Sequence, residues 1–208
     1  MTSITLALAK GRTANSTIEL LEQSGITFSA FHDKSRKLVF YSDDESIKLI
    51  FVKALDVPTY VEKGAADIGI VGKDNILEAE ADVYEMLDLK QGKCQMVVAG
   101  KKGETIDLAK KLTIASKFPT IARNYFQKKG QSVDTIKLNG SVELAPLIGL
   151  SDVIVDIVET GNTLKENGLT ILEEIEDIST RLIVNKASFT TKSDQIHQVM
   201  NTLKSALE

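Results

Sequence analysis

One stretch in the second half of the chain most constrains its fold. An apolar run from Val153 to Val158 is followed by the turn sequence Thr160-Gly161-Asn162-Thr163, and helix-favouring residues resume at Leu164. The apolar run predicts a buried strand, and the turn residues predict its end. A buried strand that leads into a helix is typical of α/β proteins, so we expect that fold class.

The turn after this strand predicts an anion site. Gly161 allows close approach of the backbone, Thr160 and Thr163 add hydroxyl donors, and free backbone N–H groups at a helix start favour a phosphate. Asp156 and Glu159 do not suit a bare phosphate, but they can accept hydrogen bonds from sugar hydroxyls. We therefore interpret the turn as a site for a phosphate and a ribose. The alternative is an ordinary strand-to-helix turn whose hydroxyls only cap the helix.

The remainder of the chain also alternates between strand-like and helix-like segments. Expected strands cover 4–9, 38–41, 47–52, 67–71, 81–89, 93–100, 112–114, 135–138 and 181–184, and 170–177 is expected to lead back between lobes. Expected helices cover 13–24, 56–63, 119–129, 141–148 and 192–207. The last helix carries an apolar stripe that we assign to core packing.

Two parts of the chain repeat one order of elements. Each runs from a strand through a lysine-bearing turn to a helix, and each ends with a strand that begins at an aspartate, Asp67 or Asp152. We therefore expect two α/β lobes with a ligand cleft between them. Residues 1–90 and 176–208 are assigned to lobe I, and residues 91–175, which include the predicted phosphate turn, to lobe II.

Basic residues stand at the ends of the expected strands of lobe I. Lys10-Gly11-Arg12 follows the first strand, at the edge where open α/β sheets bind ligands. Arg36 and Lys53 bracket the next two strands, and Gly72-Lys73-Asp74 forms a second glycine turn. The alternative for this second turn is the start of a helix capped near Asp74.

Composition and charge argue against several classes of protein. With 208 residues, 43% of them hydrophobic, the chain can bury a good core. Its net charge of −4, with acids and bases interspersed, predicts no binding to nucleic acid or to an anionic membrane. A single cysteine, no export signal and no long apolar run lead us to expect a cytoplasmic protein. His32 and His197 lack ligand spacing, so we expect no protein-bound metal and no hydrolase triad.

A spaced pattern around the phosphate turn carries a family resemblance. The pattern E-x5-G-x-S-x2-I-x-D-x3-T-G-x-T-L is fitted by Glu143, Gly149, Ser151, Ile154, Asp156, Thr160, Gly161, Thr163 and Leu164. It resembles the signature of the ATP phosphoribosyltransferases, which catalyse the first step of histidine biosynthesis. Similar segments at 8–12, 35–38, 56–62 and 64–74 extend the resemblance over nearly the whole chain. The resemblance implies a two-lobe architecture like that of the type II periplasmic binding proteins.

The resemblance also implies a reaction. N1 of ATP displaces pyrophosphate from C1 of 5-phosphoribosyl 1-pyrophosphate, with Mg²⁺ present. A ring nitrogen already carries its lone pair, and no activated serine, cysteine or histidine is evident, so positioning and electrostatics would do most of the work. Mg²⁺ is expected on substrate phosphates and water, because no carboxylate cage is visible.

By motif position, the resemblance assigns residues to each substrate. The phosphoribosyl donor is expected on Glu143, Asp156, Glu159, Thr160, Gly161, Asn162 and Thr163. ATP is expected on Lys10, Gly11, Arg12, Lys53 and Asp74. Lys10, Arg12 and Arg36 are the expected catalytic residues, which would meet the phosphates of ATP or the departing pyrophosphate. Lys53 stands where we expect arginine in many relatives, a departure from the family pattern.

The length of the chain resembles the short form of the family. Short forms resemble the catalytic half of a hetero-oligomer whose other half is a histidyl-tRNA-synthetase-like regulatory subunit, so we expect histidine to act through that partner. Two alternatives stay open. One is a two-lobe module that binds or senses a small anion without catalysis, and the other is a phosphoribosyltransferase that acts on another base.

Overall fold

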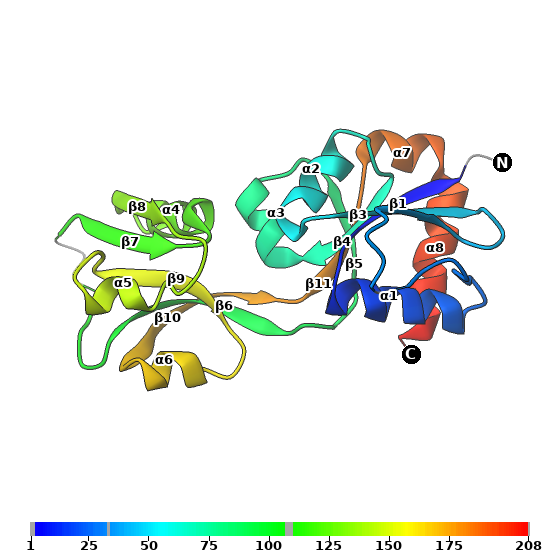
Figure 1. The fold of residues 1–208 in the computed structure, drawn as a ribbon. Helices are drawn as coiled ribbons and strands as arrows, with labels where there is room; N and C mark the ends of the chain where they lie inside the picture. Colours follow the sequence, from blue (N-terminus) through cyan, green and yellow to red (C-terminus); the bar gives the residue numbers. More distant parts are fainter. Residues whose placement is uncertain (1–2, 33, 107–109, 208) are drawn as a thin grey trace. The chain divides into compact units, whose positions relative to one another are not determined.

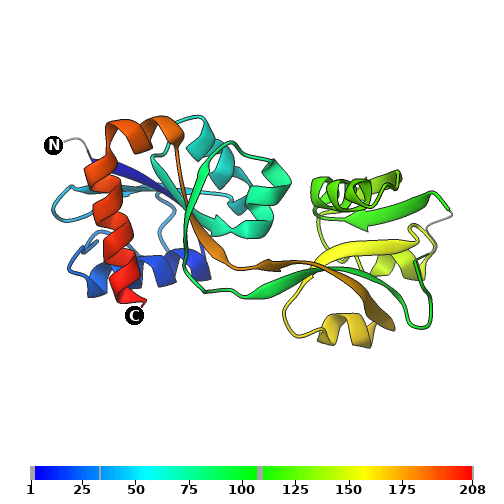
Figure 2. The same cartoon turned by 180° about the vertical axis from the view of Figure 1, so that it is seen from behind.

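The computed structural model of the chain describes residues 3–32, 34–106 and 110–207. The chain divides into two compact units: unit 1 is Met1–Gly92 with Ser179–Glu208, and unit 2 is Lys93–Ile178. It therefore leaves unit 1 once and returns once, and both of its ends belong to unit 1 (Figures 1 and 2). Within the described ranges, no helix combines the length and the apolar character needed to span a membrane.

Unit 1 is built on a six-stranded sheet in the order β2-β3-β1-β4-β11-β5. Its strands are β1 (Ile4–Ala9), β2 (Val39–Tyr41), β3 (Ile47–Val52), β4 (Ile68–Gly72), β5 (Tyr84–Asp88) and β11 (Thr180–Val184). β1 lies parallel to β3 and to β4, whereas the pairs β2-β3, β4-β11 and β11-β5 are antiparallel. The carboxyl ends of β1, β3 and β4 therefore meet at one edge of the sheet.

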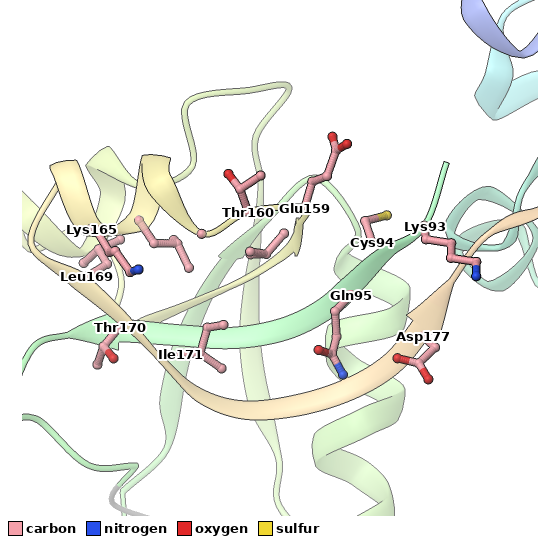
Figure 3. Close-up of a pocket in the computed structure, with 13 residues that line it drawn as sticks. Lys93, Cys94, Gln95, Glu159, Thr160, Lys165, Leu169, Thr170, Ile171 and Asp177 are labelled. Atoms are coloured by element: carbon pink, nitrogen blue, oxygen red, sulfur yellow. The ribbon is translucent and has the colours of Figure 1, made fainter. Parts of the chain in front are cut away.

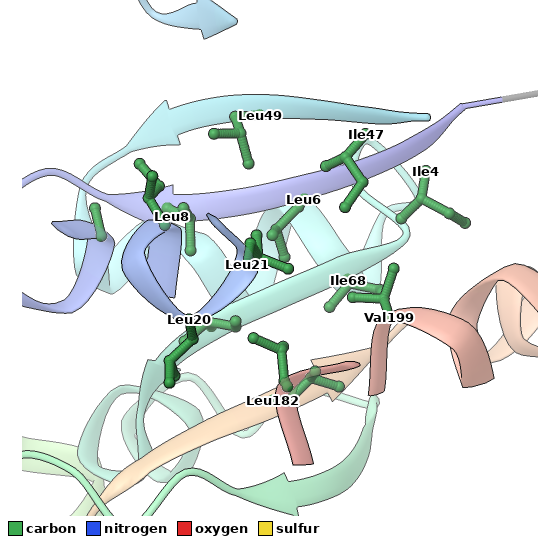
Figure 4. Close-up of a cluster of buried hydrophobic side chains, with 14 of the residues drawn as sticks. Ile4, Leu6, Leu8, Leu20, Leu21, Ile47, Leu49, Ile68, Leu182 and Val199 are labelled. Atoms are coloured by element: carbon green, nitrogen blue, oxygen red, sulfur yellow. The ribbon is translucent and has the colours of Figure 1, made fainter. Parts of the chain in front are cut away.

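Helices cover both faces of this sheet. They are α1 (Arg12–Gln23), the 3-10 helix η1 (Ala54–Asp56), α2 (Val57–Glu62), α3 (Lys73–Ala79), α7 (Lys186–Thr191) and α8 (Ser193–Ala206). Successive side chains of β1 point to opposite faces. Leu6 and Leu8 therefore pack with α1 and α8, while Ala7 packs with α2 and α3. Val199 and Leu203 of α8 are buried in the first of these clusters, which confirms the predicted core stripe (Figure 4).

Unit 2 has a five-stranded sheet in the order β10-β6-β9-β7-β8. Its strands are β6 (Cys94–Lys101), β7 (Leu112–Ser116), β8 (Val133–Lys137), β9 (Val153–Val158) and β10 (Leu169–Ile178). β9 is parallel to β7 and antiparallel to β6. Helix α4 (Pro119–Lys128) packs on β7 and β8, and α5 (Leu144–Leu147) and α6 (Asn162–Glu166) contribute to an apolar cluster on the other face (Figure 1).

Most predicted elements are present, and the differences have local causes. β1, β3 and β9 have the predicted bounds. The helix predicted over 141–148 shortens to α5 because Pro146, which lacks a backbone N–H, is tolerated only in the first turn of a helix. Ser141 instead adopts a left-handed conformation, with φ of 49°. The strand predicted over 81–89 shortens to β5.

Candidate active site

The predicted phosphate turn joins β9 to α6 in unit 2. Gly161 has φ of 75°, a left-handed conformation that glycine adopts without strain. The backbone N–H groups of Thr160, Gly161 and Thr163 have no acceptor among the described residues, and that of Asn162 reaches only Thr160 Oγ1, at 3.5 Å. Glu159, Thr160 and Thr163 are exposed. Helix α6 has only five residues, so its dipole is weak. The free backbone N–H groups of the turn are therefore what makes it suitable for an anion.

Two carboxylates lie close to this loop. The side chain of Asp156 lies on the same face of β9 as those of Ile154 and Val158, which pack with α5 and α6. Burial raises the pKa of Asp156 to about 6, and the neighbouring charge of Glu143, which directly precedes α5, also raises it. The backbone N–H of Ile157 donates to Asp156 Oδ1 at 2.9 Å and opposes this rise. The structure thus brings Asp156 and Glu143 within electrostatic reach of each other, and Asp156 lies three residues before the start of the predicted phosphate turn at Glu159.

Lys117 is a charged neighbour that sequence reasoning did not assign to the site. Parallel pairing of β7 with β9 aligns Ser116 with Val155, so Lys117 follows at the level of Asp156. Its positive charge lowers the pKa of Asp156, against the effect of burial. The available signal was the likeness of Ile114-Ala115-Ser116-Lys117 to the end of the first strand, which also leads into a lysine.

An open pocket of about 520 Å³ adjoins the phosphate loop. Glu159 and Thr160 lie on one side of it, and Gln95 of β6 and Thr170 of β10 lie on another (Figure 3). Gly161 also lines the pocket. The pocket lining does not include the two carboxylates at 143 and 156. The loop therefore lies toward the β6 and β10 side of β9.

In unit 1, the predicted basic residues lie at the edge of the sheet formed by the carboxyl ends of β1, β3 and β4. Ala9 pairs with Val52, so Lys10 and Lys53 follow neighbouring parallel strands in step. Both lysines are exposed, as is Arg12, which opens α1. The turn between strand and helix rests on Gly11, whose φ of 115° is unfavourable for any residue with a side chain.

A hydrogen bond from Lys10 to Ser35 places the neighbouring Arg36 at the same edge of the sheet. The Lys10 ammonium donates to the carbonyl oxygen of Ser35 at 2.5 Å and lies 5.6 Å from the centre of the Phe51 ring. Arg36 directly follows Ser35 and is exposed. Three predicted cations therefore lie near one another in unit 1. Arg36 is placed by the contact between Lys10 and Ser35, and Lys53 by the register of β1 with β3.

The second glycine turn is the start of α3, as the alternative interpretation predicted. Asp74 is only 8% exposed and accepts a hydrogen bond from Asn75 Nδ2 at 2.9 Å. It packs so closely on the backbone that a Cβ on Gly72 would lie 2.2 Å from Asp74 Oδ1. Little of the Asp74 side chain is thus accessible. Across the described ranges, no three His, Cys, Asp or Glu side chains gather as a set of metal ligands.

Comparison with known proteins identifies the family. The sequence model described as ATP phosphoribosyltransferase matches residues 53–205. The ATP phosphoribosyltransferase of Oceanobacillus iheyensis is 60% identical over 207 residues, covering 100% of each chain. That of Thermoanaerobacter sp. is 55% identical over 208 residues, covering 100% of this chain and 98% of the relative.

Solved structures agree with this assignment and with the predicted architecture. The ATP phosphoribosyl transferase (HisG:HisZ) complex from Thermotoga maritima matches with a TM-score of 0.87 and 39% identity over 98% of each chain. The periplasmic aliphatic sulphonate binding protein SsuA from Escherichia coli matches with a TM-score of 0.60 and 14% identity, over 99% of this chain and 68% of that one, which bears on the fold alone. The two-lobe fold like that of periplasmic binding proteins is confirmed, and the chain belongs to the ATP phosphoribosyltransferase family.

Proposed function

We propose that the loop from Glu159 to Thr163, together with Asp156 and Glu143, holds the phosphoribosyl donor for the reaction of the family. In that reaction the 5-phosphoribosyl group passes from 5-phosphoribosyl 1-pyrophosphate to N1 of ATP, and pyrophosphate is released, as the first step of histidine biosynthesis. The supporting observation is an exposed loop in which three backbone N–H groups have no acceptor among the described residues, and which follows Asp156, a carboxylate that interacts with Glu143. The N–H groups would bind the 5-phosphate, and the carboxylates would accept hydrogen bonds from the ribose hydroxyls.

The chemistry demands little of the protein beyond placement and charge. The lone pair of adenine N1 forms the new C–N bond at C1, and the C1–O bond breaks with its electron pair leaving on pyrophosphate. No proton has to leave before this bond forms, so we assign no general base to the step. Positive charge grows on the ribose ring while negative charge grows on the leaving group, and cations near the pyrophosphate would stabilise the transition state.

We assign ATP and part of that stabilisation to lobe I, residues 1–90 with 176–208, and donor binding to lobe II, residues 91–175. Lys10, Arg12 and Arg36 are exposed cations that would contact the phosphates of ATP or the departing pyrophosphate. Gly11 and Lys53 belong to the same edge and would contribute to ATP binding. Asp74 is the weakest member of this set because it is almost completely buried.

Mg²⁺ would bind through the substrates rather than through a protein cage. Asp156 and Glu143 form a pair of carboxylates, which is fewer than a dedicated site supplies, and Mg²⁺ commonly keeps substrate phosphates and water as ligands. When bound, the ion would neutralise charge on the pyrophosphate. The residues of the chain would still orient the donor and the acceptor.

A regulatory partner and a cytoplasmic location complete the proposal. A neighbouring structure is a HisG:HisZ complex at 39% identity, so we propose that this chain also joins a second kind of subunit, one resembling histidyl-tRNA synthetases. We place the enzyme in the cytoplasm, where ATP is available.

Comparison of acceptors tests the function. The full chain, with its partner subunit, would be given 5-phosphoribosyl 1-pyrophosphate and Mg²⁺ together with ATP or with free adenine, guanine or uracil. We expect release of pyrophosphate with ATP and none above background with the free bases. Donor binding without pyrophosphate release from any acceptor would instead indicate a binding module, and release with a free base would indicate another phosphoribosyltransferase.

A further inference from the structure

We propose that Lys117 binds the 1-pyrophosphate of the phosphoribosyl donor from within unit 2. This inference rests on the proposed function, because it takes the 5-phosphate to lie on the Glu159–Thr163 loop and the ribose to lie at Asp156. The inference adds Lys117 to the proposed donor site. Lys117 lies on the side of Asp156 that is away from the Glu159–Thr163 loop.

The order of strands sets the direction in which the donor would lie. In the sheet, β9 has β6 and then β10 on one side and β7 on the other. The phosphate loop leaves β9 toward β6 and β10, because it shares a pocket with Gln95 and Thr170 and because α6 packs on β10. Lys117 follows β7 on the other side. Asp156 thus lies between the loop and Lys117.

A donor placed on these groups would extend across β9. Its 5-phosphate and its pyrophosphate are attached at C5 and C1, on opposite sides of the ribose ring. If the 5-phosphate occupies the loop and the hydroxyls contact Asp156, C1 and its pyrophosphate point toward β7. The ammonium of Lys117 stands on that side, and an ammonium is a suitable partner for a phosphate oxygen.

The turn that carries Lys117 is held firmly. Ser116 is completely buried, donates its hydroxyl to the carbonyl oxygen of Val155 at 2.6 Å, and accepts the backbone N–H of Phe118 at 2.8 Å. Phe118 is also completely buried. Lys117 therefore projects from between two fixed anchors, which reduces the loss of backbone freedom when a ligand binds.

The charge of Lys117 is not neutralised by an ion pair. Among the described residues no carboxylate lies within 4.0 Å of its ammonium, which lies 5.5 Å from the centroid of the Phe118 ring. Its positive charge nevertheless acts on Asp156, which places it within electrostatic reach of the ribose site. A partly exposed lysine so placed could accept a phosphate without first breaking an ion pair.

Two ligands that differ only at C1 separate this role from a structural one. Calorimetric titration of the full chain in Mg²⁺ would compare 5-phosphoribosyl 1-pyrophosphate with ribose 5-phosphate, which lacks the pyrophosphate. For Lys117→Gln we expect the affinity for the first ligand to fall about tenfold to a hundredfold, and that for ribose 5-phosphate to change less than about twofold. Lys117→Arg should keep most of the affinity.

Matched variants make the result interpretable. Lys111→Gln removes the same charge from the opposite end of β7, where Lys111 pairs with Asp134 at 2.7 Å on the surface, and should change neither affinity. Thr160→Ala should weaken both ligands alike, because both carry the 5-phosphate. Equal losses for both ligands in Lys117→Gln, or no loss for either, would overturn the assignment of Lys117 alone. If the unmodified chain bound neither ligand, the proposed donor site itself would fail, and this inference with it.

Discussion

Asp156 is a residue at which binding and stability make opposite demands. Burial on β9 and the nearby Glu143 raise its pKa to about 6. An acid whose folded pKa is raised destabilises the folded state once the pH exceeds its ordinary value near 4, and this cost is complete above about 6. The presence of a carboxylate at this position, despite its cost to stability, is explained if Asp156 must accept hydrogen bonds from the hydroxyls of a bound ribose.

Replacement of Asp156 by asparagine tests this trade-off. Asp156→Asn should raise the free energy of unfolding by about 1 to 3 kcal/mol near pH 8, because the buried charge is removed, and should change it little near pH 4. Affinity for the phosphoribosyl donor should fall about tenfold. Urea unfolding at both pH values and calorimetry would measure these effects. Asp134→Asn, on the exposed surface of β8, is the control.

An unchanged donor affinity in Asp156→Asn would remove this residue from the site. A loss of stability near pH 8 would mean that the carboxylate contributes favourable contacts that outweigh its burial.

Candidate site residues that are close in sequence can be recognised from the sequence, whereas those joined by sheet pairing cannot. The loop from Glu159 to Thr163 is one continuous turn, so its glycine and hydroxyls were visible in the sequence. Lys117 lies 39 positions before Asp156 and meets its level only through the register of β7 with β9. That register is set by hydrogen bonds between Asp152 and Thr113, which are far apart in the sequence.

At the scale of elements, both units use one device to join a pair of parallel strands. In unit 1, Asp67 before β4 accepts the backbone N–H of Thr5 at 2.8 Å and donates its own N–H to the Thr5 carbonyl. In unit 2, Asp152 before β9 makes the same two bonds with Thr113, the first at 2.7 Å. The predicted correspondence of the two aspartates therefore has a physical basis: each sets the register of its strand.

The two aspartates differ in burial and in the number of hydrogen bonds that they accept. Asp67 is buried and also accepts hydrogen bonds from Ser188 Oγ at 2.6 Å and from Lys192 Nζ at 2.9 Å, which ties α7 and α8 to the sheet. Burial alone would raise the pKa of Asp67, but the bonds from Lys192, Ser188 and Thr5 outweigh it and lower the pKa. Asp152 is exposed.

Asparagine substitution should separate these roles. Asp67→Asn should lower the free energy of unfolding by about 2 to 3 kcal/mol near pH 7, since it leaves the Lys192 charge without its partner. Because the folded pKa is lowered, this difference should shrink as the pH falls through about 4 and below. Asp152→Asn should cost about 1 kcal/mol or less. Urea unfolding across this pH range measures both, and equal losses would show that Lys192 and Ser188 contribute nothing.

The packing of α2 on the sheet depends on a glycine. A Cβ at Gly69 of β4 would lie 2.7 Å from Val61 and 2.8 Å from Val57, both completely buried. Gly69→Ala should therefore destabilise the chain by about 1 to 3 kcal/mol, because the core has no room for the methyl group. Gly140→Ala, with no atom within 4 Å of the added Cβ, is the control and should change stability by less than about 1 kcal/mol. A thermal midpoint unchanged in both variants would contradict this account.

The predictability of elements follows their length and apolar content. β1, β3 and β9 could be predicted with their bounds because continuous or alternating apolar residues end at clear turn residues. Helix α7 was not predicted, and the start of α3 was only an alternative interpretation, because their six and seven residues are too few to establish a helical period. Their formation depends on tertiary contacts, such as Asn185 Oδ1, which accepts the N–H of Ser188 at the start of α7.

At the scale of the whole molecule, the two-lobe architecture follows from repetition of one α/β plan. Each unit has its own sheet and its own apolar clusters, and unit 1 is completed by the returning strand β11 and by α8. The sequence predicted two lobes because the order of strand, lysine turn and helix recurs. The likeness to a periplasmic binding protein, at 14% identity, extends over 99% of the chain, which agrees with this two-lobe fold.

Regulation by histidine would involve the assembly of this chain with its regulatory subunit. We expect histidine to leave the activity of the single chain unchanged and to inhibit the assembly with its regulatory subunit, since the proposed sensing site lies on the partner. The measurement is initial rate against histidine concentration for the two preparations. Inhibition of the rigorously purified single chain would contradict this expectation.

Formation of the N1-substituted adenine is the decisive test of the catalytic role of this chain. The purified chain would be mixed with ATP, 5-phosphoribosyl 1-pyrophosphate and Mg²⁺, with and without the regulatory subunit, and the near-ultraviolet absorbance of the product followed. We predict a rise that requires the partner or grows with it. Absence of any rise in either mixture, while both substrates bind, would contradict the assignment of this chain as the catalytic subunit.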